Sequence, residues 1–266
     1  MLPQAGGLRH VSSCPVAAFS SVMGICGLGL CWRVAAQVLS APHAIGEGLI
    51  ALAAALFVVL GTMYLLKLCT APDAVAAEFR NPATSSQFGS LTIALLLLAA
   101  GILPYAPQSA LAIWAVGAAG QCLLLLTLLG RWISEPTELG NSTPSWLIPI
   151  VGNATAAFAG VPLGFPEISW FLFTVGLGFW LTFLPLLLNR LIFHHEPLPG
   201  RLAPTLALLV ASPAVLCLAW LQLTGRVDET YRIICSLPIL RVACDAPLAA
   251  SRPLAGLGRL VDFHLS

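Results

Sequence analysis

Ionisable side chains are scarce in this sequence. Of its 266 residues, 9% are Asp, Glu, Lys or Arg and 58% are hydrophobic, whereas soluble domains contain about 25% charged residues. The fifty residues between Arg80 and Arg131 include none of the four charged types. A bilayer interior penalises every ionised or unpaired polar group, so a stretch of this kind suits lipid and not water. The composition therefore excludes a soluble domain and indicates an integral membrane protein.

Other absences exclude further classes of function. The formal net charge is +1 and the basic residues form no block, so no nucleic acid or acidic protein partner is indicated. The eight cysteines show no C-x-x-C motif and no metal-ligand spacing. His194 and His195 are adjacent and do not share a helix face, so we expect an interfacial loop at residues 194–196 instead of a metal site. The apolar runs contain no nucleophile beside a base, and we predict no enzyme activity, catalytic residue, metal or cofactor.

Seven apolar runs are long enough to cross a membrane. A spanning helix needs about 20 apolar residues, and at least about 17. The links between the runs are short, which favours antiparallel neighbours. The sequence therefore predicts an all-α, polytopic membrane bundle whose spans are residues 16–32, 45–66, 86–103, 110–129, 146–163, 168–188 and 202–223.

The basic residues predict the orientation of the bundle, because short cytoplasmic loops hold the excess of Lys and Arg. The amino-terminal side and the links after even-numbered spans carry Arg9, Lys67, Arg80, Arg131, Arg190 and Arg201. The opposite side carries Arg33, Arg226 and Arg232. We expect a cytoplasmic amino terminus.

The predicted spans alternate between two chemical kinds. Odd spans are rich in small or polar residues, such as Gly24, Thr92 and Asn153, whereas even spans are bulky, as in the leucine run 123–126. Small residues allow close helix contact, and bulky residues suit lipid. The pattern predicts an inner layer of odd helices and an outer layer of even ones. Ordinary helix packing is the alternative explanation of the same pattern.

Two features favour a pore over ordinary packing. Pro149 and Pro213 lie inside odd spans, where a proline frees a carbonyl and bends the helix. No span has a charged residue near its middle, whereas proton-coupled carriers need ionisable relays within the membrane. A neutral lining binds ions weakly enough to release them, so the sequence indicates passive conduction.

Four ordered motifs carry a family resemblance. Residues 189–225, NRLIFHHEPLPGRLAPTLALLVASPAVLCLAWLQLTG, resemble the tellurite-resistance/dicarboxylate transporter family, which includes TehA-type proteins and plant slow anion channels. Residues 19–32, 78–88 and 146–164 resemble the first helix, the second link and the fifth helix of that family. The resemblance implies a ten-helix fold of five hairpins, with odd helices around a central pore and even helices outside.

The resemblance also implies a function and a location. Members of the family pass small anions, among them nitrate, chloride, tellurite and C4-dicarboxylates, commonly as homotrimers with one pore in each subunit. We therefore expect an anion channel or passive transporter in the bacterial inner membrane, with small anions and the lipid bilayer as partners.

Six residues of the odd spans are candidates for the pore lining. The Asn153 amide suits either the pore or a bond between helices, and Phe19 and Phe158 either narrow a pore or serve packing. Ser212 and Pro213 lie where the seventh helix of the family bends. The candidates are Phe19, Thr92, Asn153, Phe158, Ser212 and Pro213.

The resemblance ends near Arg232. Residues 233–266 are interrupted by Pro238 and by scattered charges, a texture typical of out-of-frame translation. We interpret residues 1–14 as a cytoplasmic segment, 15–232 as the channel-like domain and 233–266 as an irregular tail of a truncated or frameshifted product. Such a product lacks helices eight to ten, including the phenylalanine that gates the pore in the family, and a nonfunctional remnant is the alternative to a working channel.

Overall fold

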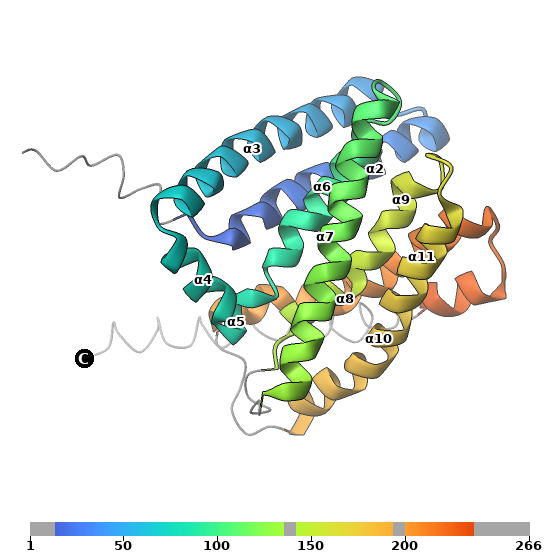
Figure 1. Ribbon diagram of the computed structural model, residues 1–266. Helices are drawn as coiled ribbons and strands as arrows, with labels where there is room; N and C mark the ends of the chain where they lie inside the picture. Colours follow the sequence, from blue (N-terminus) through green and yellow to red (C-terminus); the bar gives the residue numbers. More distant parts are fainter. Residues whose placement is uncertain (1–13, 136–141, 194–199, 237–266) are drawn as a thin grey trace, which may run out of the picture.

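The computed structural model describes residues 14–135, 142–193 and 200–236 as a bundle of helices without β-strands (Figure 1). Six helical stretches of these ranges are long and apolar enough to cross a membrane: Val16–Leu39, His43–Thr70, Pro82–Ile102, Pro107–Ser134, Pro166–Phe193 and Leu202–Thr224. They match six of the seven predicted spans. The elements that form them are η1 (Val16–Ala18), α2 (Phe19–Leu39), α3 (His43–Thr70), α5 (Pro82–Ser85), α6 (Phe88–Ile102), α7 (Pro107–Ser134), α10 (Pro166–Phe193), η5 (Gly200–Ala207) and α11 (Leu208–Thr224), and α4 (Pro72–Arg80) links α3 to α5.

The predicted fifth span is an irregular segment in the structure, and it is not among the six long apolar helices of the described residues. The chain from Pro144 to Gly160, here called the fifth segment, alternates between η3 (Pro144–Trp146), α8 (Leu147–Val151), η4 (Gly152–Ala156) and α9 (Ala157–Gly160). Pro149 has no backbone N–H to donate. Asn153 and Thr155 hydrogen-bond to carbonyls of Pro149 and Gly152 in their own segment, in competition with the regular helix.

The irregular geometry lengthens the fifth segment. An α-helix rises about 1.5 Å per residue and a 3-10 helix about 2.0 Å. With nearly half of its residues in 3-10 turns, the segment reaches about 30 Å, the thickness of a bilayer's hydrocarbon core. A chain that is short for a regular spanning helix can therefore cross the membrane.

The fifth segment lies at the centre of the fold. It supplies Ile150 and Ala154 to a core with α10 and α11, Ile148 to a core with α2 and α6, and Ala156 and Ala159 to a core with α6 and α7. All residues from 142 to 157 are buried. Among the described elements, the fifth segment alone contributes buried residues to all three cores, so its path sets the positions of the surrounding helices.

Two side chains of α7 attach that helix to the fifth segment. Trp114 Nε1 donates a hydrogen bond to the Ala156 carbonyl at 2.8 Å, and Gln121 Nε2 donates to the Pro149 carbonyl at 2.9 Å. Gly152 makes the approach of α7 possible, because a Cβ atom there would collide with the Gln121 amide. The donors are seven residues apart on α7 and the acceptors are seven residues apart on the fifth segment, in the opposite order along the chain, as an antiparallel pair requires.

Ion pairs lie near the ends of the spans. Lys67 Nζ donates to Glu78 Oε2 at 2.7 Å and to the Cys14 carbonyl at 2.9 Å, and Glu78 Oε1 accepts the Val16 backbone N–H at 2.7 Å. Near the other end of α2, Arg33 donates to Glu47 through Nε at 2.8 Å and Nη2 at 2.7 Å. The first network fixes the start of η1 and α2 against α4. The second joins α2 to α3.

The predicted boundary segments lie largely outside the described residues. Of the predicted amino-terminal segment 1–14, the structure describes Cys14 alone, and residues 194–196 are outside it. Of the predicted tail 233–266, residues 233–236 are described; they are helical, and Ile234 is buried. The irregular tail predicted from residue 233 is therefore regular over these four residues, because Ile234 packs into the core formed by α10 and α11.

We predict that Glu78→Gln destabilises the protein. The substitution removes the carboxylate charge and leaves the Lys67 ammonium, which is 5% exposed, without its ionic partner. Breaking a buried ion pair costs about 3 kcal/mol, and thermal unfolding in detergent measures the loss. Asp73→Asn is the matched control, because Asp73 is exposed on the same helix. Equal losses in the two variants would contradict the role of the network.

We also predict that Gln121→Leu weakens the contact between α7 and the fifth segment. The change removes the donor to the Pro149 carbonyl at a buried site, and the expected cost is about 1–2 kcal/mol. Thr127→Val is the control, because the Thr127 hydroxyl is exposed and bonds only to the Leu123 carbonyl of its own helix. Denaturant unfolding in detergent compares the two; a Gln121→Leu variant as stable as the parent would contradict the prediction.

Candidate functional site

The odd-numbered predicted spans correspond to α2, α6, the fifth segment and α11, and these form a connected row. In order along the chain, α2 contacts α6, α6 contacts the fifth segment, and the fifth segment contacts α11. The two middle members of the row are the most buried, whereas α2 and α11 at its ends leave more surface exposed than α7 does. The predicted inner position thus applies most strongly to α6 and the fifth segment, because these are enclosed by neighbours on all sides.

Asn153 lies in the middle of the fifth segment and is fully buried. Its Nδ2 donates to the Pro149 carbonyl at 2.9 Å and to the Ile150 carbonyl at 3.3 Å. Among the described residues, its Oδ1 atom has no hydrogen-bond partner. The amide therefore serves the local bend and bonds within its own segment, instead of to a neighbouring helix.

Thr92 on α6 faces α7. Its hydroxyl donates to the Gly89 carbonyl at 3.0 Å and contacts Gln121 Oε1. Gln121 also donates to the fifth segment, so it connects two odd spans. Gln121 was not among the predicted pore residues, although it is the single amide side chain of the predicted span 110–129.

Phe158 lies where two of the cores meet. Its ring packs against the core of α10 and α11 and also against the core of α2 and α6, and the side chain is half-buried. Leu208 at the start of α11 packs against the same two cores. Phe158 therefore lies between the core of α10 and α11 and the core of α2 and α6, and part of its side chain is exposed.

Ser212 and Pro213 lie together in α11, and both are buried. The Ser212 hydroxyl donates to the Leu208 carbonyl one turn earlier, which is near the bend that Pro213 introduces. Phe19 lies apart from the other candidates. It is fully buried against Phe57 and Tyr64 of α3, with ring centroids 5.6 and 6.0 Å away.

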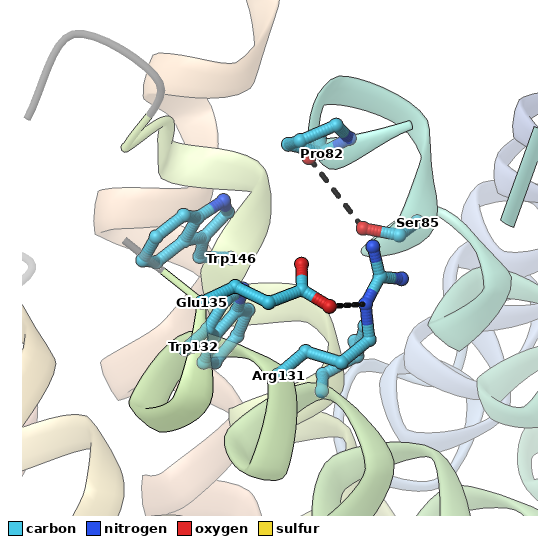
Figure 2. Close-up of a pocket in the computed structure, with 7 residues that line it drawn as sticks. Pro82, Ser85, Arg131, Trp132, Glu135 and Trp146 are labelled. Carbon is cyan, nitrogen blue, oxygen red and sulfur yellow. Dashed lines mark hydrogen bonds and ion pairs between the residues drawn. The ribbon is translucent and has the colours of Figure 1, made fainter. Parts of the chain in front are cut away.

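A small pocket lies away from these candidates, between α5, the end of α7 and η3 (Figure 2). Arg131 lines it, with Nη1 and Nη2 each donating at 2.8 Å to the carbonyls of Phe79 and Arg80. Glu135 lies 3.8 Å from Arg131 Nε, and Trp132 stacks on Trp146 with centroids 4.4 Å apart. The guanidinium thus joins α7 to the end of α4. This pocket was not predicted from the sequence.

The middles of the described spans are neutral. The buried charged residues of the described chain are Lys67 and Arg190, which lie near the carboxyl ends of α3 and α10. No group of three or more His, Cys, Asp or Glu side chains in the described ranges could hold a metal ion. The described interior therefore contains hydroxyls, the buried amides of Gln121 and Asn153, and apolar side chains.

Comparison with known proteins places this arrangement in a family. A family model described as voltage-dependent anion channel matches residues 13–258. The match continues beyond Arg232, where the sequence analysis placed the end of the resemblance; the domain division itself stays a prediction.

Individual relatives agree with the family model. The S-type anion channel SLAH3 of Arabidopsis thaliana is 29% identical over 231 residues, which are 82% of this chain and 36% of that protein. The tellurite resistance protein TehA homolog of Haemophilus influenzae is 27% identical over 225 residues, 83% of this chain and 67% of that protein. An uncharacterized transporter of Methanocaldococcus jannaschii is 31% identical over 164 residues, 56% of this chain and 47% of that protein.

The chain spans less than half the length of the plant channels that it matches first. The names of these relatives describe channels, transporters and a resistance protein, and none of them describes an enzyme. With the family model matching most of its length and a helical bundle of the expected kind, this chain belongs to the voltage-dependent anion channel family.

Proposed function

We propose that this protein conducts small anions passively across a membrane, along a path bordered by α2, α6, the fifth segment and α11. The observation that carries the proposal is the neutral, irregular fifth segment at the centre of a channel-family bundle. A mobile anion needs donors that hold it weakly, and a fixed charge at mid-membrane would trap or repel it. The described interior supplies hydroxyl and amide groups without such a charge.

The pore-lining candidates play different roles in this proposal. Phe158 narrows the path, because its partly buried ring lies between the core of α10 and α11 and the core of α2 and α6. Asn153, Ser212 and Pro213 shape the bends of the odd spans, and the hydroxyl of Thr92 holds α6 to α7. The packing of Phe19 against α3 supports a structural role for that residue.

The proposed substrates are small anions such as nitrate, chloride, tellurite or C4-dicarboxylates. The name of the Haemophilus influenzae relative refers to tellurite resistance, and the names of the plant relatives refer to anion channels. We further propose that the protein resides in a bacterial inner membrane with its amino terminus in the cytoplasm, as a homotrimer. Lys67, Arg80 and Arg131 support this orientation, because contacts with the α4 region bring them to one end of the bundle.

The alternative proposal is that the protein is a nonfunctional remnant of such a channel. The exposed surfaces of α2 and α11 at the ends of the row favour it, because an odd-helix ring with open ends does not enclose a pore. Association between chains is one way to cover those surfaces. The two readings differ in whether purified protein conducts.

Anion flux in liposomes tests the proposed function. Vesicles containing the purified full chain and loaded with a chloride-sensitive dye are expected to exchange external chloride or nitrate faster than empty vesicles. Vesicles with the same amount of an unrelated helical membrane protein control for leakage. Flux equal to that of the controls, together with a low unfolding temperature, would favour the remnant.

A substitution tests the role of Phe158. We expect Phe158→Ala to raise anion flux several-fold, because it removes the ring that we propose narrows the path. Phe171→Ala is the matched control, since Phe171 is 60% exposed on α10, and we expect unchanged flux. The unfolding temperature of each variant separates a change in conduction from a change in folding. Equal flux in the Phe158→Ala variant and the parent would refute a narrowing role.

A further inference from the structure

The chain forms a helical hairpin after α11. α11 ends at Thr224, and Gly225 adopts the left-handed conformation with φ of 65°, which glycine accepts without steric cost. Residues 229–236 are helical. Asp228 caps this second helix, because its Oδ1 atom accepts the Tyr231 backbone N–H at 2.9 Å.

Polar and apolar contacts hold the second helix against α11. The indole Nε1 of Trp220 donates to Asp228 Oδ1 at 3.0 Å. The hydrogen bonds from Tyr231 and Trp220 hold the pKa of Asp228 below its ordinary value, as expected for a carboxylate stabilised in its charged form. Ile234 is 7% exposed and joins the core that contains Leu216. Residues 229–236, here called the return helix, are therefore packed against the rest of the fold.

The hairpin brings two cysteines together. Cys217 Sγ on α11 lies 2.6 Å from Cys235 Sγ on the return helix, and 3.8 Å from the Tyr231 carbonyl oxygen. A disulfide bond measures about 2.0 Å, so little movement is needed to form one. Within the described ranges, no other two cysteine sulfurs are in contact. Cys217 is 2% exposed, whereas Cys235 is partly exposed.

We propose that Cys217 and Cys235 form a reversible disulfide that locks the return helix onto α11. The oxidant is a low-molecular-weight disulfide. The Cys235 thiolate attacks one of its sulfur atoms, and the first reagent thiolate leaves as a mixed disulfide forms. The Cys217 thiolate then displaces the second reagent thiolate. Two protein thiols become one disulfide, the reagent is reduced to two thiols, and the protons from both cysteines end on them.

The expected orientation of the bundle fits this chemistry. An odd span in a protein with a cytoplasmic amino terminus ends on the opposite side of the membrane, and α11 corresponds to the seventh predicted span. The hairpin then faces the bacterial periplasm, an oxidising compartment in which disulfides persist. The disulfide proposal itself depends on the contact between the sulfur atoms and stands apart from the conduction proposal.

Peptide mapping of the full chain tests the proposal. The purified protein is reduced, freed of reductant, incubated with oxidised glutathione, alkylated and digested with trypsin. Cys217 and Cys235 fall in different tryptic peptides, residues 202–226 and 233–241. We expect these two peptides to be recovered as one disulfide-linked species that dithiothreitol separates. Recovery of both peptides in alkylated form would overturn the proposal.

The other cysteines supply the controls. Cys217→Ser and Cys235→Ser should each abolish the linked species, whereas Cys122→Ser, a change on α7, should leave it intact. Cys244 lies outside the described residues, in tryptic peptide 242–259, because trypsin does not cleave between Arg252 and Pro253. A link between that peptide and residues 233–241 in place of the expected one would also overturn the proposal.

Thermal unfolding gives an independent readout. A disulfide restricts the unfolded chain, so oxidation should raise the unfolding temperature of the parent and of Cys122→Ser. The unfolding temperature of Cys235→Ser should not respond to the oxidant. A linked species without any stabilisation would show that the bond forms but does not lock the hairpin, and would overturn that part of the proposal.

Discussion

The hydrogen bonds from α7 to the fifth segment are the constraint on which the rest of this structure depends. The fifth segment is buried from its start to Ala157, and in a membrane no water is available to satisfy its carbonyls. Trp114 and Gln121 donate to two of them. Because the same segment contributes to all three cores, the placement of α2, α6, α10 and α11 follows from where α7 holds it.

The charged side chains near the membrane-spanning helices also have partners. The charges of the Lys67–Glu78 and Arg33–Glu47 pairs lie near span ends, each with a partner within 2.7 Å. Both pairs also tie successive elements together, α3 to α4 and α2 to α3. The middle of the described bundle contains hydroxyl, amide and apolar side chains. A neutral interior of this kind is compatible with passage of an ion through weak contacts, as membership in an anion channel family suggests.

The carboxyl-terminal hairpin shows how a few specific contacts order the chain after α11. The residues around Arg232 have no long apolar run, and the pattern there indicated an irregular tail. The structure nevertheless packs a short helix against α11, because Asp228 caps it, Trp220 bonds to the cap and Ile234 enters a core. The contacts of Trp220 and Ile234 join the return helix and its cap to α11 and its core, and a count of consecutive apolar residues does not detect them.

By itself, the sequence determined that the chain is a helical membrane bundle, where six of its spans lie and which family it belongs to. These follow from run length, scarcity of charge and ordered motifs, all of which are local properties. The sequence pointed to the bend at Pro149, but only the tertiary structure decided that the fifth segment alternates between 3-10 and α-helical turns and that Gln121 and Trp114 support it. The tertiary structure also decided that Phe19 packs against α3 and that Phe158 lies between two cores. These features depend on which surfaces meet. The donors that bond to a buried carbonyl and the side chains that pack against a ring come from distant parts of the chain, and the spacing of residues along the sequence does not identify them.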